Sequence, residues 1–166
     1  MKVFRPLALT GVLVAIVALV FIPAALAAIV IHEGKGPGKA RLGQIDTKAA
    51  SYLGNHAKPR RDSNYGSRVV YWINFGKRMK DGRYPSEMLS NSNHEVFQFA
   101  FNSAAYSTAR GIEVGSTEAQ LNAKYIGMRR IHTTKFNHYI LGKRPFTDFW
   151  VLNATQRVYQ IIVRSK

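Results

Sequence analysis

The sequence contains no cysteine. This absence excludes disulfide bonds, catalysis by a thiolate and zinc sites with cysteine ligands. It also excludes a bacterial lipoprotein anchor, in which a cysteine carries the lipid. Without such cross-links the fold depends on its hydrophobic core, and 46% of the 166 residues are hydrophobic. The many Tyr, Phe and Trp residues favour a sheet over a helical bundle.

Acidic residues are scarce: 9 Asp and Glu stand against 24 Lys and Arg, for a formal net charge of +15. Lys2 and Arg5 precede a long apolar stretch, so 22 basic residues remain beyond it. Such a balance implies an anionic neighbour, which could be lipid headgroups, an acidic protein surface or a nucleic acid. Nucleic acid is the least favoured of the three, because the sequence has no RNA-binding signature.

Motifs for catalysis, metals and cofactors are missing as well. Asp46, Glu113 and Glu118 fall in or beside the first turns of expected helices, where the helix dipole favours anions. No serine lies in a nucleophile elbow, and His132 and His138 lack metal-ligand spacing. We therefore expect no enzymatic activity, no cofactor and no metal. A ligand or metal bound at His132 and His138 would revive the enzyme hypothesis.

The N-terminal region has 25 uncharged residues from Leu7 to Ile31. A helix of that length is long enough to cross a bilayer, so the sequence predicts a membrane anchor over residues 1–31 with the following domain on the exported, periplasmic or extracellular, side. The alternative is a signal peptide cleaved near Ala27, because Ala25 and Ala27 supply a small-residue site. Residues 32–40, rich in Gly and Lys, are then expected to form a flexible linker.

An internal repeat is the strongest signal in the remaining chain, with copies at residues 41–103 and 104–166. The landmark pairs occur in the same order. They are "RLGQIDTKAASYLGN" and "EVGSTEAQLNAKYIGM", then "YWINFGKR" at 71–78 and "NHYILGKR" at 137–144, then "YPSEMLSNSNHEVFQFAF" at 84–101 and "FTDFWVLNATQRVYQIIV" at 146–163. The last pair aligns without a gap, with Asn91 on Asn153.

Each copy is expected to form one helix followed by three strands. Asp46 or Thr47, and Ser116 or Thr117, are good N-cap residues. Alternation in the last strands predicts one apolar face that the helix covers. The residues of that face are Phe97, Phe99 and Phe101 in the first copy and Tyr159, Ile161 and Val163 in the second. The predicted class is α+β, in which a single transmembrane helix precedes two αβββ repeats that form one curved antiparallel sheet with helices on one face.

Two αβββ units in tandem, with the "GIEVGSTEAQL" pattern and a glycine closing each helix, resemble the beta-lactamase inhibitor protein and the small envelope-assembly lipoproteins of the SmpA/BamE type. The resemblance covers residues 42–163. It implies helices on the convex side of a curved sheet, a concave face that grips other proteins, and no enzymatic activity. The chain departs from the pattern because it lacks the inhibitor's disulfides and the lipidated cysteine.

The repeat phase predicts which residues bind a partner. An exposed tryptophan among amides and histidine is typical of a protein-binding anchor. Six residues are expected to share the concave face opposite the helices: Trp72, Asn74, Gln98, His138, Ile140 and Gln160. If the phase is off by one residue, Trp72 lies under a helix instead.

Basic pairs recur in both copies. One set follows the helices and the other closes the first strands: Arg60, Arg61, Arg129 and Arg130, and Lys77, Arg78, Lys143 and Arg144. The two sets are expected at opposite ends of the sheet, roughly 23 Å apart. They could contact anionic lipid headgroups, or they could be ordinary solvated turns that keep strand edges from pairing.

These observations predict a non-enzymatic, membrane-anchored protein-binding subunit, an accessory or stabilising component of a larger membrane protein complex. The alternative is an inhibitor or immunity protein that binds an exported enzyme or toxin through its concave sheet.

Overall fold

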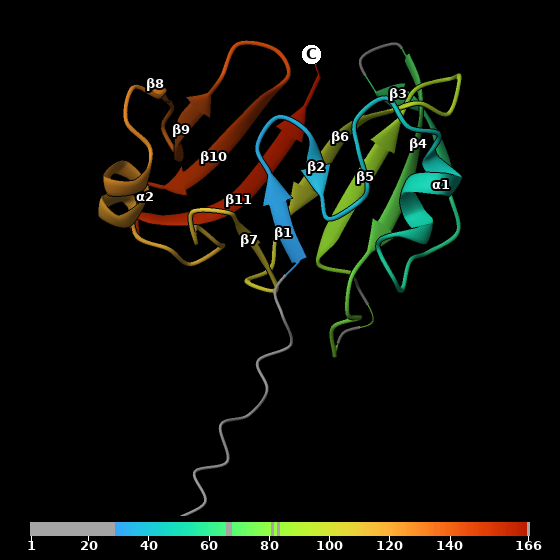
Figure 1. Ribbon diagram of the computed structural model, residues 1–166, viewed down its shortest axis with the longest axis horizontal. Helices are drawn as coiled ribbons and strands as arrows, with labels where there is room; N and C mark the ends of the chain where they lie inside the picture. Colours follow the sequence, from blue (N-terminus) through green and yellow to red (C-terminus); the bar gives the residue numbers. More distant parts are fainter. Residues whose placement is uncertain (1–28, 66–67, 81, 83, 166) are drawn as a thin grey trace, which may run out of the picture.

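The computed structural model describes residues 29–65, 68–80, 82 and 84–165, and its main feature is an eight-stranded sheet (Figure 1). The strand order across the sheet is β3-β4-β5-β6-β11-β10-β9-β8, and every pairing is antiparallel. The strands are β3 (Arg60–Tyr65), β4 (Arg68–Phe75), β5 (Ser86–Ser90), β6 (Val96–Phe101), β8 (Arg129–His132), β9 (Phe136–Leu141), β10 (Phe146–Leu152) and β11 (Arg157–Arg164). The antiparallel sheet expected from the sequence is confirmed.

Two short helices accompany this sheet: α1 (Asp46–Ser51) has 6 residues and α2 (Glu118–Lys124) has 7. Thr117 caps α2 through a capping box with Gln120, which satisfies backbone N–H groups of the first turn. The N-cap of α1 is Ile45, which has no side-chain hydrogen bond, so the expected cap by Asp46 or Thr47 was wrong. Asp46 is instead the first helical residue, and its buried Oδ2 accepts a hydrogen bond from Ser90 Oγ.

The predicted α+β class was wrong, because the described chain is predominantly β. Each helix is followed by four strands of the large sheet rather than three: α1 by β3–β6 and α2 by β8–β11. The additional strands are β3 and β8, which form the two edges of the sheet. Their sequences contain the basic pairs that were expected to follow the helices, and charged edge strands resist pairing with other chains.

A second, three-stranded sheet lies beside the large one, with the order β2-β1-β7. It consists of β1 (Ile29–His32), β2 (Gly36–Pro37) and β7 (Tyr106–Thr108), and β1 pairs with β7 in parallel. Ile31 is fully buried in the hydrophobic core. Strand β1 thus places residues before the first repeat next to residues that follow β6.

The membrane helix expected at the N-terminus needs correction. Residues 29–31 were assigned to a membrane helix, but they form β1 of the folded domain. In the described part of the chain no helix is long and apolar enough to cross a membrane. The expected helix over residues 7–31 otherwise lies outside the described residues, as does the expected cleavage near Ala27.

The expected flexible linker at 32–40 is also wrong, because part of it is packed against the core. Ala40 is fully buried, and Gly36 adopts a φ of +135° that favours glycine. A Cβ atom at Gly36 would lie 2.6 Å from the Ala40 carbonyl oxygen and 2.8 Å from Phe99 Cε2. This segment therefore depends on glycine to approach the sheet.

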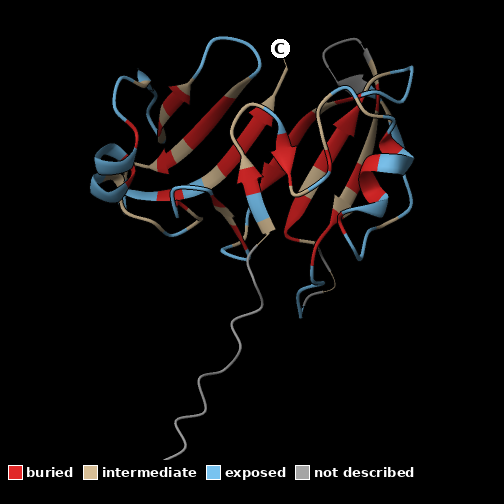
Figure 2. Ribbon diagram, viewed as in Figure 1, coloured by how far each residue is buried: buried red, intermediate tan, exposed pale blue. Residues whose placement is uncertain are grey.

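The hydrophobic core lies on the face of the large sheet that the helices cover (Figures 1 and 2). Both helices contribute to it, α1 through Ala49 and Ala50 and α2 through Leu121. The small sheet covers the same face, since Ile31 and Tyr106 belong to the same cluster. The opposite face of the large sheet is called the helix-free face below.

A bulge in each repeat changes which side chains reach the core. The β5–β6 register shifts between Leu89 and Ser90, and the β10–β11 register shifts between Trp150 and Val151. Val158 therefore fills the core at 1% exposure, whereas Tyr159, expected on the core face, is 52% exposed. In the first repeat Val96 is likewise buried, and the expected core residue Phe97 is only half-buried.

The strand register also places one extra residue in the second copy. Ser90 pairs with Val96, enclosing five residues (91–95), whereas Val151 pairs with Val158, enclosing six (152–157). The gapless alignment of 84–101 with 146–163 is therefore wrong by one residue before the turn. As a result Glu87, opposite Asn74, corresponds to Asp148, opposite Ile140.

Candidate protein-binding face

The helix-free face consists of cross-strand neighbours that form rows across the sheet. One row crosses seven strands: Asn74, Glu87, Ala100, Ile162, Asp148, Ile140 and Arg129. A second row contains Arg60, Trp72, Leu89, Gln98, Arg164 and Phe146. A third row lies within the second repeat: Gln160, Trp150, His138 and Ile131.

All six residues predicted for partner binding lie on this face, but they are dispersed over the three rows. Trp72 and Asn74 are half-buried in the first repeat, and His138 and Gln160 are half-buried in the second. Gln98 and Ile140 are buried, with exposures of 8% and 7%. These last two offer little contact area to a partner.

The second repeat contains a group of rings, here named the aromatic cluster: Phe136, His138, Trp150 and Tyr159. The ring centroids of Phe136 lie 5.4 Å from Trp150 and 5.5 Å from Tyr159. His138 packs against Trp150 with a centroid distance of 4.6 Å. Tyr159 is 52% exposed. Ile131 of β8, which pairs with His138, is 40% exposed. Exposed aromatic groups of this kind are typical of protein-binding anchors.

A buried carboxylate holds this cluster in place. Asp148 is fully buried, and its Oδ2 accepts a hydrogen bond from Trp150 Nε1 at 2.9 Å. The same oxygen lies 3.4 Å from His138 Nδ1 and 3.2 Å from Arg164 Nη2. Three side chains from three strands therefore converge on one oxygen. These contacts fix the orientation of the three side chains.

The first repeat has a carboxylate at the corresponding place with different surroundings. Burial raises the pKa of Glu87, and the nearby positive charge of Arg60 partly opposes that rise. At the places of Trp150 and His138 the first repeat has Leu89 and Trp72. The two halves of the helix-free face thus share a backbone plan and differ in chemistry.

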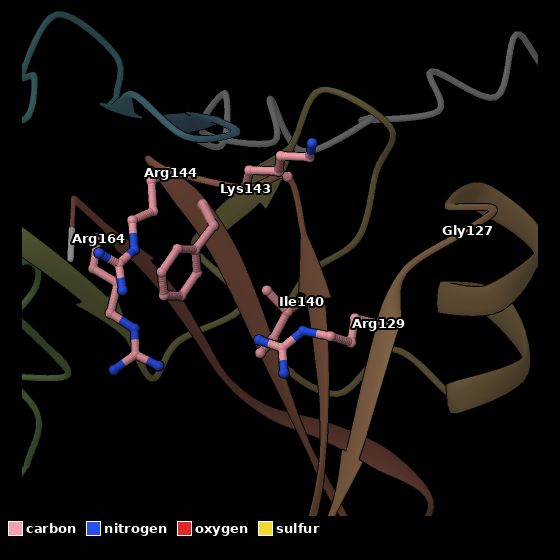
Figure 3. Close-up of a pocket in the computed structure, with 8 residues that line it drawn as sticks. Gly127, Arg129, Ile140, Lys143, Arg144 and Arg164 are labelled. Atoms are coloured by element: carbon pink, nitrogen blue, oxygen red, sulfur yellow. The ribbon is translucent and has the colours of Figure 1, made fainter.

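The basic pairs do not lie as the sequence predicted. A hollow of about 730 Å³ is lined by Arg129 from β8, Lys143 and Arg144 from the β9–β10 turn, and Arg164 from β11 (Figure 3). Residues of both predicted sets therefore meet at one end of the sheet instead of lying at opposite ends. The reason is that β8 runs antiparallel to β9. Arg129, at the start of β8, therefore lies beside Ile140, near the end of β9.

The other basic residues are distributed over different surfaces. Arg130 lies 3.9 Å from Glu118 and over the Tyr139 ring, on the helix-covered side. Arg60 is on the helix-free face opposite Trp72, and Arg61 points to the other side by alternation. Arg78 donates to the Gly82 carbonyl oxygen, while Lys77 is exposed in the same turn. The eight predicted residues do not form one continuous surface.

The histidines that could have revived an enzymatic hypothesis are not brought together. His138 pairs with Ile131 and His132 pairs with Asn137, so the two rings lie on opposite faces of the sheet. His132 Nδ1 contacts Asn137 Oδ1 at 2.7 Å. Among the residues that the structure describes, no group of three or more His, Asp and Glu side chains could hold a metal ion.

Comparison with known proteins gives a likeness of fold. No model of a known protein family matches the sequence, and no curated protein sequence matches it. The structure is similar to the crystal structure of the uncharacterized protein YfeY from Escherichia coli, with a TM-score of 0.56 and 14% sequence identity. The match covers 79% of this chain and 97% of that one. At this identity the chain shares a fold with YfeY, and the likeness shows nothing further.

Proposed function

We propose that the protein is a non-enzymatic binding domain that holds a protein partner on its helix-free face. The observation that carries this proposal is the aromatic cluster around Trp150 and its exposed neighbours Tyr159 and Ile131. Aromatic side chains bury a large area at low entropic cost, and they dominate the binding energy of many protein interfaces.

The packing of the cluster supports this proposal over a purely structural role. The hydrophobic core is on the other face, where it is closed by the helices and the small sheet. The cluster contributes nothing to that core, yet its rings are fixed by Asp148 and by mutual contacts. Rigid, partly exposed rings on an open sheet face are suited to an interface.

Photo-crosslinking tests the proposal with two tyrosines that differ mainly in location. Tyr159 is 52% exposed on the helix-free face, and Tyr52 is 40% exposed at the C-terminal cap of α1. A photoreactive phenylalanine analogue replaces each in the full chain expressed in its native cells. We expect a discrete protein adduct from position 159 and none from position 52. Equal labelling at both positions, or none at 159, would contradict the proposal.

The identity of the captured protein then separates the two functional hypotheses drawn from the sequence. A stoichiometric integral-membrane complex supports an accessory subunit, and a soluble exported enzyme or toxin supports an inhibitor or immunity protein. In a second control the photoreactive analogue replaces Ile131. Tyr159→Ala should abolish the adduct formed from that position, whereas Tyr52→Ala should leave it unchanged.

We also propose that the N-terminal segment directs the domain out of the cytoplasm. Lys2 and Arg5 precede the apolar run, and Ala25 and Ala27 provide a small-residue site. A cut after Ala27 would leave every described strand intact, since the first of them is Ile29–His32. An alkaline phosphatase fused after the last residue should be active, since this enzyme folds only where disulfides form. An inactive but intact fusion would contradict export, and the mass of the purified chain would reveal cleavage.

A further inference from the structure

The hollow at the end of the second repeat lies directly beside the aromatic cluster. Arg164 contacts Asp148 Oδ2 at 3.2 Å, and the same oxygen accepts the bond from Trp150 Nε1. One buried carboxylate therefore orients both a wall of the hollow and the central ring of the cluster. The hollow and the cluster form one continuous part of the helix-free face.

The charge of this hollow is strongly positive and uncompensated. Arg129, Lys143 and Arg144 make no ion pair within the part of the chain that the structure describes. Arg164 is neutralised by Asp148, which is fully buried and so presents no negative charge at the surface. Three cationic residues thus line one hollow without a described counter-charge (Figure 3). Their mutual repulsion is relieved when an anion binds.

The floor of the hollow is apolar. Ile140 and Phe146 line it, and the Arg164 guanidinium stacks over the Phe146 ring at 4.8 Å. Stacking fixes the plane of the Arg164 guanidinium, which also contacts Asp148. A volume of about 730 Å³ exceeds a single small anion and admits several side chains of a polypeptide.

We infer that this hollow binds the carboxylate side chains of an acidic segment belonging to the same protein partner that covers the aromatic cluster. The inference rests on the proposed protein-binding function and specifies the chemistry of the partner. Continuity with the aromatic cluster favours a protein over a phospholipid, because one carboxylate contacts both Arg164 of the hollow and Trp150 of the cluster. The partner surface is therefore expected to place Asp or Glu residues next to apolar residues.

Fluorescence anisotropy with a labelled hexaglutamate peptide tests this inference on the full chain. The pocket variant combines Arg129→Gln with Arg144→Gln. The matched control combines Arg61→Gln with Lys77→Gln, which removes the same charge from exposed positions in the first repeat. We expect the pocket variant to weaken peptide binding by about tenfold or more, and the control to weaken it by about twofold or less. Hexaglutamine should not bind to any of the three proteins.

Several outcomes would overturn the inference. Equal weakening by both double variants would show general charge attraction rather than a site. Absence of hexaglutamate binding would also overturn it, as would pocket-dependent binding to phosphatidylglycerol vesicles without peptide binding, which would assign the cations to lipid. In each of these cases the crosslink at position 159 still reports on the proposed function separately. An adduct there would show that the function holds while the acidic-segment inference fails.

Discussion

At the scale of single residues, Asp148 links the fold to the candidate site. It is fully buried on a face that is otherwise partly open, and one of its oxygens receives contacts from three strands. These donors replace the water that Oδ2 loses on burial, whereas Oδ1 is buried without a hydrogen-bond partner among the described residues. Removal of Asp148 should therefore affect both stability and the shape of the face.

We predict that Asp148→Asn lowers the free energy of unfolding by about 1.5–3 kcal/mol, since the charged hydrogen bonds from Arg164 and His138 are lost. Urea denaturation at pH 7 measures the change. Glu95→Gln is the control, because Glu95 is exposed in a turn, and it should change stability by less than about 0.5 kcal/mol. An Asp148→Asn protein as stable as the wild type would show that the contacts contribute nothing net.

Removal of the Glu87 carboxylate, unlike that of Asp148, should stabilise the protein at neutral pH. Burial raises its folded-state pKa above the ordinary value of 4.5, so the folded state favours the protonated form. The contribution of protonated Glu87 to the free energy of unfolding is fully present below pH 4.5. It is lost as the pH rises through the raised pKa. Glu87→Gln should match the wild type in acid and become more stable at neutral pH. Chemical denaturation across that pH range checks this.

Arg60 supplies the control for the pH experiment. Its positive charge partly lowers the pKa of Glu87, so Arg60→Gln should extend the loss of stability to higher pH. A stability profile that is the same for wild type, Glu87→Gln and Arg60→Gln would contradict the assignment.

At the scale of elements, β1 attaches the N-terminal part of the described chain to the core. Ile31 is fully buried between the sheets, whereas its neighbour Val30 is 37% exposed. We predict that Ile31→Ala costs about 2–5 kcal/mol of stability, in the range for large-to-small core substitutions. Val30→Ala should cost less than about 1 kcal/mol. Equal, small effects in thermal denaturation would show that β1 does not pack as described.

The elements also show how far the sequence alone was informative. Gly-Lys-Arg at 76–78 and 142–144 correctly marked the ends of β4 and β9, because glycine and charged residues end strands. The alternation at Trp72 and Asn74 correctly placed them opposite the helices. Strands β3 and β8 were missed since they consist mostly of polar residues and show no apolar alternation.

The bulges explain why the aromatic cluster was missed. Strict alternation from Ile161 and Val163 assigns Tyr159 to the core, but the bulge turns it outward and buries Val158. The gapless alignment likewise matched Trp150 with Met88, a core residue, so Trp150 was not recognised as a residue of the helix-free face. A signal was present in Thr147, Phe149 and Val151, whose alternation leaves Asp148 and Trp150 on the other face. Strand register depends on pairing partners that one strand's sequence does not contain.

At the scale of the whole molecule, the two repeats share one sheet through the β6–β11 pair. A break between them would expose the backbone groups of both strands and divide the common core. We therefore expect the described domain to unfold in one cooperative transition.

The two tryptophans of the chain make this testable, since Trp72 lies in the first repeat and Trp150 in the second. Each of the variants Trp72→Phe and Trp150→Phe keeps one fluorescent reporter. When Ala49→Gly is added to either variant in α1, both reporters should shift to lower urea midpoints by similar amounts. A shift confined to the Trp72 reporter would show that the halves unfold independently.

The pairing of β6 with β11 gives the sheet an approximate twofold axis, yet the two sides of that axis display unlike side chains on the helix-free face. In the second repeat Trp150 and His138 contact the buried Asp148, whereas the residues at their places in the first repeat are Leu89 and Trp72. The backbone of the sheet is thus approximately symmetric, whereas the side chains on its helix-free face are not. A partner can dock in one orientation and not in the reversed one. The expected stoichiometry is one partner segment per chain, even though the architecture itself is duplicated.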